Sequence, residues 1–291
     1  MTAEAGFPVA PVGHRCAVLG SPVAHSLSPV LHEAAYAELG LTGWSYARVE
    51  VQGDGLAAFV DGLDASWRGL SLTMPLKVAV LELAGVTSVS DTAWLTGAGN
   101  TLLLDGPARA VHNTDVGGLV SAVRQVLSGP VRTVTVVGSG ATARSGVASA
   151  ARLGATRVQV MARDPRKAEA LRPLADAVGV ELVVVPWGNA PPASDLLVST
   201  VTAGAVDDVA GALVACADVV FDVVYDPWPT ALASAAARAG VRVIDGLDLL
   251  VGQAVLQVGL MTGRRPSSEV LRAAGDAALA ARNAGPGSSA P

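Results

Sequence analysis

Short apolar stretches alternate along this chain with longer segments whose apolar residues recur every three or four positions. The apolar stretches predict buried strands, and the periodic segments predict helices with one apolar face. Ser28 and Pro29 are expected to supply the N-cap and the first position of the first helix. In the first part of the chain we expect strands at 16–19, 44–49, 70–73 and 101–104, and helices at 28–39, 75–83 and 115–127.

A more regular alternation begins after Gly129 and Pro130, which interrupt the pattern. Regular exchange of strands and helices is typical of a parallel sheet covered by helices. The expected strands are 133–137, 157–161, 181–185, 195–199, 219–223 and 241–244, and the expected helices are 142–153, 165–178 and 230–239. Two further helices are expected at about 247–261 and 266–281.

The pattern as a whole predicts an α/β fold with two domains and a boundary between residues 115 and 130. We expect one domain over 14–115 and a second over 116–246, with the terminal helices at about 247–282 packing back on the first. A length of 291 residues agrees with this division, because domains usually have about 100–200 residues. The ends, 1–13 and 283–291, are rich in Ala, Pro, Gly or Ser and are expected to be loose.

Composition narrows the class of protein. With 51% hydrophobic and 15% charged residues, the chain can bury real cores, which excludes a disordered protein. Charged residues or Gly interrupt every apolar stretch before it could span a bilayer, and no secretory leader is recognisable. The net charge of −5 without a basic stripe argues against nucleic acid or an anionic membrane as partner. Two cysteines form no framework, so we expect a reducing, cytoplasmic location.

The strongest local signal is Gly-Ser-Gly-Ala-Thr-Ala at 138–143, directly after an expected strand and before an expected helix. Gly138 permits the tight turn, Gly140 lets a pyrophosphate approach the helix N-terminus, and Ala143 keeps the helix close to the strand. In this context the motif predicts a dinucleotide site that also includes Ser139, Ala141 and Thr142. The simpler alternative is a glycine-rich turn that binds nothing.

Cofactor choice is expected to depend on the tip of the second strand of this domain. An acid there would bind the ribose hydroxyl of NAD, whereas an Arg would pair with the 2′-phosphate of NADP. The chain has Arg163 first, then Asp164, with Arg166 and Lys167 close behind. The net positive charge favours NADP; the alternative is a solvated helix start of mixed charge.

Polar motifs follow the expected strand ends of the first domain, where open α/β sheets bind ligands. The histidines lack the spacing of zinc ligands, so we expect no metal site. The Gly-x-Ser-x-Gly motif of the nucleophile elbow is absent from the sequence, so we expect no serine hydrolase. The motifs offer hydroxyls, amides, one ammonium and one carboxylate, which suits a polyhydroxylated acid, although each alone could be capping or turn chemistry. They are Ser-Leu-Ser-Pro at 26–29, Ser-Leu-Thr-Met-Pro-Leu-Lys at 71–77, Gly-Ala-Gly-Asn-Thr at 97–101 and Asn-Thr-Asp at 113–115.

In order and spacing these motifs resemble the shikimate dehydrogenase family over about residues 14–275. Further matches are Tyr-Asp-Pro-Trp-Pro-Thr at 225–230 and Asp-Gly-Leu-Asp-Leu-Leu-Val-Gly-Gln-Ala at 245–254. The resemblance implies a substrate domain and a Rossmann-like NADP domain with a cleft between them. It also implies reversible NADPH-dependent reduction of 3-dehydroshikimate to shikimate, a step towards chorismate and the aromatic amino acids. It leaves the oligomeric state open, with a homodimer as one candidate.

The resemblance also implies roles for individual residues. Lys77, one of only two lysines, corresponds to the catalytic proton donor and acceptor, and Asp115 to its partner. A lysine ammonium can protonate the alkoxide that forms when a ketone is reduced. The positions implied for the substrate are Ser26, Ser28, Thr73, Asn100, Asp115, Tyr225 and Gln253, and those implied for the cofactor are 138–143, Arg163, Lys167 and Gly246.

Several alternatives stay open at this stage. Asp164 stands where the family has a phosphate-binding hydroxyl, which keeps NAD use open. An NAD(P)-dependent quinate/shikimate or aminoshikimate dehydrogenase is therefore the nearest rival. A non-catalytic ligand-sensing paralogue and a one-carbon folate dehydrogenase are more distant ones. A surface ion pair is the plain alternative for Lys77 and Asp115.

Overall fold

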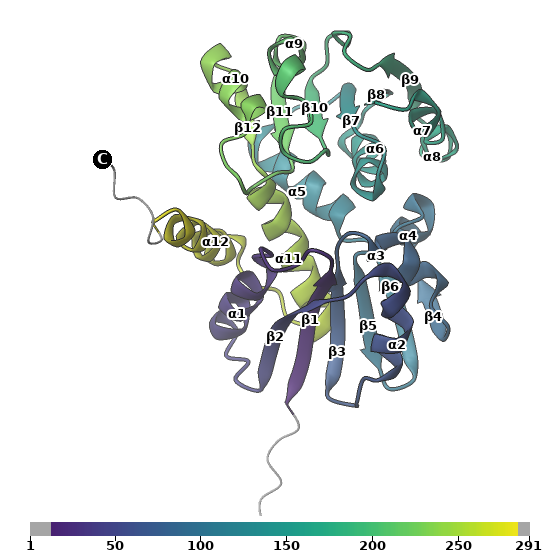
Figure 1. Cartoon of the computed structure of the whole chain (residues 1–291), viewed down its shortest axis with the longest axis vertical. Coiled ribbons are helices and arrows are strands. Elements are labelled where there is room, and N and C mark those ends of the chain that lie inside the picture. Colours follow the sequence, from purple (N-terminus) through teal and green to yellow (C-terminus); the bar gives the residue numbers. More distant parts are fainter. Residues whose placement is uncertain (1–12, 285–291) are drawn as a thin grey trace, which may run out of the picture.

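The computed structural model describes residues 13–284. It contains two six-stranded sheets, which lie one above the other in Figure 1. The expectation of loose ends at 1–12 and 285–291 lies outside the described residues, and Asn283 is helical instead. Among the helices of 13–284, none combines the length and the apolar character needed to cross a bilayer.

The first sheet has the strand order β2-β1-β3-β5-β6-β4 and is parallel except for one strand. β5 runs antiparallel to both of its neighbours, because it forms a hairpin with β6 around Gly106, whose φ is +56°. The strands are β1 (His14–Gly20), β2 (Trp44–Glu50), β3 (Trp67–Leu72), β4 (Val86–Val89), β5 (Thr101–Asp105) and β6 (Ala108–His112). The helices are α1 (Ser28–Glu38), α2 (Leu56–Asp61), α3 (Leu76–Ala79), α4 (Asp91–Thr96) and α5 (Asp115–Val126).

The second sheet is entirely parallel, with the order β12-β11-β10-β7-β8-β9. Read from the other edge, this is the Rossmann order, with the direction of winding reversed between β7 and β10. Its strands are β7 (Thr133–Val137), β8 (Arg157–Ala162), β9 (Glu181–Pro186), β10 (Leu196–Ser199), β11 (Val219–Asp222) and β12 (Arg242–Ile244). Its helices are α6 (Ala141–Leu153), α7 (Pro165–Glu169), α8 (Arg172–Ala177), α9 (Ala210–Val214) and α10 (Ala231–Ala239).

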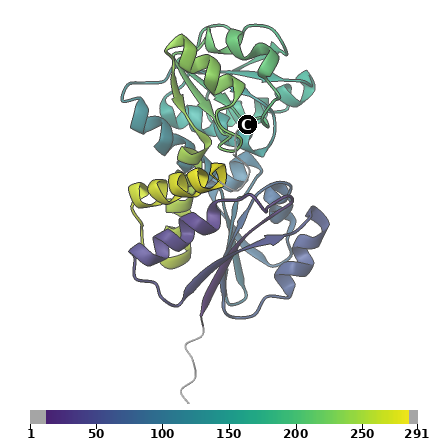
Figure 2. The same cartoon turned by 60° about the vertical axis from the view of Figure 1, so that its left-hand side comes forward.

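The chain returns to the first half in α11 (Gly246–Thr262) and α12 (Ser268–Asn283). Figure 2 shows α12 beside α1, and buried residues of both terminal helices share one core with β1 and α1. Arg272 of α12 binds the Asp245 carboxylate at 2.8 Å and thereby fixes α12 to the start of α11. The terminal helices therefore complete a core that the first strand and the first helix begin.

α5 and α11 pack against each other at two glycines and connect the two halves. A Cβ atom on Gly252 would lie 2.9 Å from Cα of Gly118, so side chains are excluded at the crossing. Leu119 and Val123 of α5 belong to the core of the second half, while α11 places Leu249 in that core and its other buried residues mainly in the first. The close approach of the two backbones thus sets how the halves sit relative to each other.

Three helices differ from the expectation in capping or continuity, beyond shifts of one or two residues at the ends of others. α1 begins with Ser28 inside the helix, Leu27 takes the N-cap position, and no side chain caps it. The helix expected over 165–178 is divided into α7 and α8, because Pro173 lies in the first turn of α8 and cannot donate a helical N–H. The helix expected over 75–83 is one α-helical turn followed by a 3₁₀ turn, Val80–Glu82.

Candidate active site

A cavity of about 240 Å³ lies where the two halves meet. Val23 and Leu72 of the first half and Val223 of the second provide apolar parts of its wall. The polar groups come from strand ends and helix starts of both halves, as the sequence predicts for an α/β ligand site. Seven of the expected site residues line the cavity: Ser26, Ser28, Thr73, Lys77, Tyr225, Gly246 and Gln253.

Ser26 lies between β1 and α1, and Ser28 is the first residue of α1. We call residues 21–28 the serine loop. The Ser28 backbone N–H donates to Ser26 Oγ at 3.2 Å, and the two hydroxyl oxygens are also 3.2 Å apart. Both side chains face the same cavity. Two hydroxyls held this close can donate to the two oxygens of one carboxylate.

Lys77 and Asp115 form a largely buried ion pair at the cavity wall. Lys77 Nζ lies 2.5 Å from Asp115 Oδ2, and the side chains are only 15% and 3% exposed. Lys77 projects from the single turn α3, and Asp115 is the first residue of α5, where the helix dipole favours a carboxylate. This burial argues against the plain surface ion pair that the sequence left open.

Asn100 fixes the other oxygen of Asp115. The Asn100 amide Nδ2 donates to Asp115 Oδ1 and to Gln253 Oε1, both at 2.9 Å. Its orientation is determined because Asn100 Oδ1 accepts from the Thr114 backbone N–H at 2.8 Å. Lys77 and Asn100 thus hold one oxygen each of a single carboxylate, and Gln253 of α11 joins the same network.

Two polar lining residues, Ser71 and Gln257, were not assigned a role from the sequence. Ser71 Oγ accepts from the Tyr46 hydroxyl at 2.6 Å and donates to Gln257 Oε1 at 2.8 Å. Gln257 Nε2 donates to Thr101 Oγ1 at 3.1 Å, behind Asn100. Gln257 follows Gln253 by four residues on α11, a spacing that places both on one helix face and could have identified it.

His32 lies behind this network and is fully buried. Its ring stacks on Tyr46, with the centroids 3.9 Å apart, and Nε2 lies 3.3 Å from Gln257 Oε1. Burial lowers the pKa of His32 to about 3, against a smaller opposing effect of the Gln257 hydrogen bond. The imidazole is therefore neutral near pH 7, with its Nε2 proton directed at Gln257.

Tyr225 and Gly246 come from the second half and close the cavity on that side. Burial raises the pKa of the Tyr225 phenol, so the hydroxyl stays protonated and available as a donor near neutral pH. Gly246 begins α11, and a Cβ there would lie 2.1 Å from the Val223 carbonyl oxygen. Only glycine permits this close approach of α11 to the segment after β11.

The glycine turn at 138–143 forms a second group of expected residues, at the start of α6. Gly138 has φ of +117°, and a Cβ there would lie 2.3 Å from Thr200 Oγ1. The N-cap residue Gly140 provides no side-chain cap, and a Cβ on it would meet no atom within 4 Å. Uncapped N–H groups beside open space at the start of a 13-residue helix suit a pyrophosphate, so the residues fit a dinucleotide.

Arg163 and Asp164 follow β8 at the same edge of the sheet. Asp164 caps α7 by accepting from the Arg166 N–H at 3.0 Å, and it also forms an ion pair with the Arg166 guanidinium. The same Arg166 contacts lower the pKa of Asp164. Arg163 is exposed and lies over the Trp187 ring, with the guanidinium carbon 5.4 Å from its centroid. Asp164 therefore has a structural partner, while Arg163 lies at the surface.

The expected cofactor residues lie along the carboxyl-terminal edge of the parallel sheet, the edge at which its strands end, and lead towards the cavity. Arg163 follows β8, Gly138 follows β7, and Gly246 follows β12, which is four strands from β8 in the order β8-β7-β10-β11-β12. At about 4.8 Å per strand this edge extends roughly 19 Å. It ends at Gly246, which also lines the cavity, so an extended ligand on this edge would reach the cavity with one end.

Comparison with known proteins gives consistent results. Residues 18–102 match the family model described as "Shikimate dehydrogenase substrate binding domain". The chain is 37% identical over 287 residues to the shikimate dehydrogenase (NADP(+)) of Citrifermentans bemidjiense, which covers 93% of this chain and 96% of that relative. Both chains are thus aligned over nearly their full lengths.

Two solved structures are similar over nearly the whole fold. The crystal structure of Mycobacterium tuberculosis shikimate dehydrogenase is 40% identical, with a TM-score of 0.84, and covers 91% of this chain and 99% of that one. The shikimate 5-dehydrogenase of Thermus thermophilus, solved in complex with NADP(H) and shikimate, is 31% identical with a TM-score of 0.80. It covers 91% of this chain and all of its own.

Proposed function

The chain belongs to the shikimate dehydrogenase family, and we propose that it reversibly reduces 3-dehydroshikimate to shikimate with NADPH. This oxidoreductase reaction is a step towards chorismate and the aromatic amino acids. The observation that carries the proposal is the buried Lys77–Asp115 pair in a cavity lined by hydroxyls and amides from both halves. No metal is part of the proposal.

We assign the two halves different tasks. Residues 14–115, completed by the terminal helices at about 247–282, bind the substrate, and residues 116–246 bind NADP. The first assignment is supported by the shared core of α1, α11 and α12 and by the cavity beside them. The second is supported by the Rossmann strand order and the uncapped glycine turn at the start of α6.

The substrate is held by groups of complementary chemistry. The paired hydroxyls of Ser26 and Ser28, together with the Tyr225 hydroxyl, bind the carboxylate. Thr73 and Gln253 in the cavity wall, together with Asn100 and Asp115 behind it, bind the ring hydroxyls. A small polyhydroxylated acid satisfies this set of donors and acceptors better than an apolar ligand would.

Lys77 moves the proton. In reduction the ketone carbon receives a hydride, which bound NADPH supplies, and the carbonyl oxygen becomes an alkoxide. The Lys77 ammonium stabilises that charge as it develops and donates a proton to the oxygen, while in oxidation the neutral amine takes the proton back. Asp115 orients the ammonium through the 2.5 Å contact, and Asn100 keeps Asp115 in place.

NADP is held by the strand edge that leads to the cavity. The turn at 138–143 receives the pyrophosphate, Gly246 borders the nicotinamide, and Arg163 with Lys167 faces the 2′-phosphate. The engagement of Asp164 with Arg166 favours NADP over NAD, because that carboxylate already has a partner and is less suited to a ribose hydroxyl. A cytoplasmic location and a homodimer remain predictions, to be checked by cell fractionation and light scattering.

Initial rates measured at the nicotinamide absorbance band test this function. Shikimate and quinate are each combined with NADP⁺ and with NAD⁺, and we expect a strong preference for shikimate with NADP⁺. Comparable rates with quinate or NAD⁺ would move the protein to the quinate/shikimate class. No rate in any combination would favour a ligand-sensing paralogue, which binding of shikimate without turnover would then identify.

A further inference from the structure

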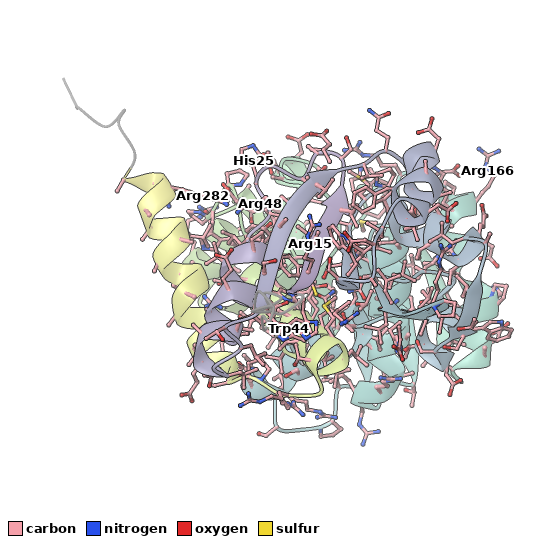
Figure 3. The ribbon with its side chains drawn as sticks, turned by 90° about the horizontal axis from the view of Figure 1, so that it is seen from below. Arg15, His25, Trp44, Arg48, Arg166 and Arg282 are labelled. Atoms are coloured by element: carbon pink, nitrogen blue, oxygen red, sulfur yellow. The ribbon has the colours of Figure 1, made fainter. Side chains whose placement is uncertain are left out.

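Two arginines hold the serine loop from outside the cavity. Arg48 of β2 donates from Nε to the Ser26 carbonyl oxygen at 2.8 Å, and Arg282 of α12 donates from Nη1 to the His25 carbonyl oxygen at 3.0 Å. Figure 3 shows Arg48, Arg282 and His25 grouped on one side of the molecule. Consecutive carbonyl groups of the loop are thus bound from two different elements.

Arg282 also reaches the second half of the molecule. The same Nη1 atom lies 3.2 Å from Asp226 Oδ2, in the segment that follows β11. The residue before Asp226 is Tyr225, which lines the cavity and packs against the core that contains Leu27 of the serine loop. One guanidinium nitrogen therefore joins two chain segments that contribute donors to the same end of the cavity.

The contacts of Arg282 go beyond its ion pair. The pair itself is exposed, with the side chains of Arg282 and Asp226 accessible to 31% and 36%, so alone it would contribute little to stability. The same guanidinium also binds a carbonyl group of the serine loop. Its charge lowers the pKa of Tyr225, against the larger effect of burial, so it also acts on a cavity residue.

The charges around the serine loop balance. Arg48 and Arg282 place two positive charges beside the loop, and Asp226 and Glu50 place two negative charges there. Glu50 of β2 accepts a hydrogen bond from the Ser21 hydroxyl at 2.8 Å. The arginines therefore act on the loop through hydrogen bonds to its carbonyl groups and not through an excess of positive charge.

We propose that Arg282 is a positioning residue that clamps the serine loop to the Tyr225–Asp226 segment and so fixes the relative positions of the hydroxyls that bind a substrate carboxylate. Arg48 holds the same loop from β2 through the Ser26 carbonyl oxygen. This inference rests on the proposed function, because it takes the carboxylate of shikimate as the group that these hydroxyls bind.

The test compares Arg282→Ala and Arg282→Lys with the wild type. We expect KM and the equilibrium dissociation constant for shikimate to rise about tenfold in Arg282→Ala, or about 1.4 kcal/mol, because the serine loop loses its hydrogen bond at the His25 carbonyl oxygen and its connection to Asp226. The kcat and the KM for NADP⁺ should change by less than about twofold, because the proton-transfer pair is untouched. Arg282→Lys, which keeps the charge, should recover part of the affinity.

Arg238→Ala is the matched control, since Arg238 is an exposed arginine near the end of α10, outside the serine loop and the segment it joins. Arg238→Ala should leave kcat, both KM values and the dissociation constant for shikimate unchanged. The double variant Arg282→Ala/Asp226→Asn should raise the dissociation constant for shikimate by less than the product of the increases in the two single variants, as expected for groups in direct contact. An unchanged KM for shikimate in Arg282→Ala would overturn the inference. So would a fall in kcat and a rise in the KM for NADP⁺ as large as the rise in the KM for shikimate.

Hydrogen exchange separates failure of the clamp from failure of the proposed function. In the ligand-free protein, Arg282→Ala should speed exchange of the amides at 23–28 and leave those of β7 and β8 unchanged. If the wild type does not turn over shikimate, the proposed function fails whatever the exchange shows. If it does turn over shikimate and exchange in the serine loop is the same in both proteins, the clamp fails alone.

Discussion

Side-chain amides, whose two ends differ chemically, decide which way the hydrogen bonds around the cavity run. Asn100 Oδ1 accepts from Thr114, so its Nδ2 must face Asp115 and Gln253. Gln257 Oε1 accepts from Ser71, so its Nε2 faces Thr101. In each amide a donor fixes the oxygen, so the nitrogen on the other side must donate. Because Asn100 donates to Asp115 Oδ1, Asp115 Oδ2 is left for Lys77.

Replacing Lys77 should separate proton transfer from binding. In Lys77→Ala we expect turnover to fall by about 10²- to 10⁴-fold, the usual contribution of a general acid or base, with little change in the affinity for shikimate. Lys77→Arg should also be slow, because a guanidinium keeps the charge beside Asp115 but does not release its proton near neutral pH. Single-turnover rates and equilibrium titration measure the two effects.

A near-normal turnover number in Lys77→Ala would refute the role given to this residue. Thermal unfolding of both variants serves as the control, because removing one partner of a buried pair can itself destabilise the fold by about 3–5 kcal/mol. Lys77→Arg retains a cation for Asp115 and should unfold closer to the wild type. A slow but stable Lys77→Arg therefore attributes the loss to proton transfer.

His32 should make stability depend on pH. Its pKa is about 3 in the folded protein against 6.5 for the unperturbed group, so between these values the unfolded chain binds the proton and the folded protein does not. Stability is therefore lost as the pH falls below 6.5, by about 2 kcal/mol between pH 7 and pH 5 from this residue. His32→Gln keeps a nitrogen donor for Gln257 but does not titrate.

Urea unfolding of wild type and His32→Gln at pH 7 and pH 5 measures this contribution. The difference between the two proteins matters, because carboxylates with shifted pKa values contribute to both profiles equally. We expect the variant to lose about 2 kcal/mol less than the wild type over this range. Equal losses would mean that the His32 pKa is not lowered by burial.

At the scale of elements, the crossing of α5 and α11 controls where the site residues lie. Gln253 follows Gly252 directly, and Asp115 begins the helix that carries Gly118. A Cβ on Gly252 would lie 2.9 Å from both Cα and the carbonyl oxygen of Gly118. Because backbone atoms cannot turn aside as side chains do, Gly252→Ala must separate the two helices.

We expect Gly252→Ala to destabilise the protein by about 1–3 kcal/mol, the usual cost of overpacking, and to raise the KM for shikimate by displacing Gln253. Gly259→Ala is the matched control on the same helix, since a Cβ there meets no atom within 4 Å. That change should stabilise by up to about 1 kcal/mol, because alanine is the better helix former. Similar free energies of unfolding for both variants would contradict the close crossing.

Periodicity predicted the long elements well and the short ones poorly. The expected strand at 133–137 coincides with β7, and the expected helix at 142–153 differs from α6 by one residue. Periodicity did not predict α2, β4, α4, β6 and α9, which are four to six residues long and too short to show a period. Pro173 marked the division between α7 and α8, a local signal that could have been used.

The candidate site was predictable where it lies at strand ends and not where it depends on distant pairing. Ser26, Thr73 and Lys77 each occur in a motif beside an expected strand, and the structure brings them to one cavity. Ser71 and Gln257 interact across 186 positions of the chain, a proximity that only the tertiary fold creates. The position of Asp164 was visible in the sequence, but its capping of α7 was not.

At the scale of the whole molecule, the order of the chain and the order in space differ. The terminal helices α11 and α12 complete the core of the first half, and Leu249 of α11 also belongs to the core of the second. Leu119 and Val123 of α5 belong to that second core, while its first residue, Asp115, lies in the site of the first half. α11 thus contributes to a core in each half, whereas α5 joins the core of the second half to the site of the first.

Shared helices should make the two halves unfold together. NADP⁺ at about 100 times its dissociation constant stabilises the folded state by about 2.7 kcal/mol. If unfolding is cooperative, the slowest amides of β1 and β3 should then exchange about 100-fold more slowly with NADP⁺, like those of β7 and β8, although the cofactor is expected on the second sheet alone. Protection confined to the second sheet would mean that the halves open separately, with α5 and α11 acting only as a hinge between them.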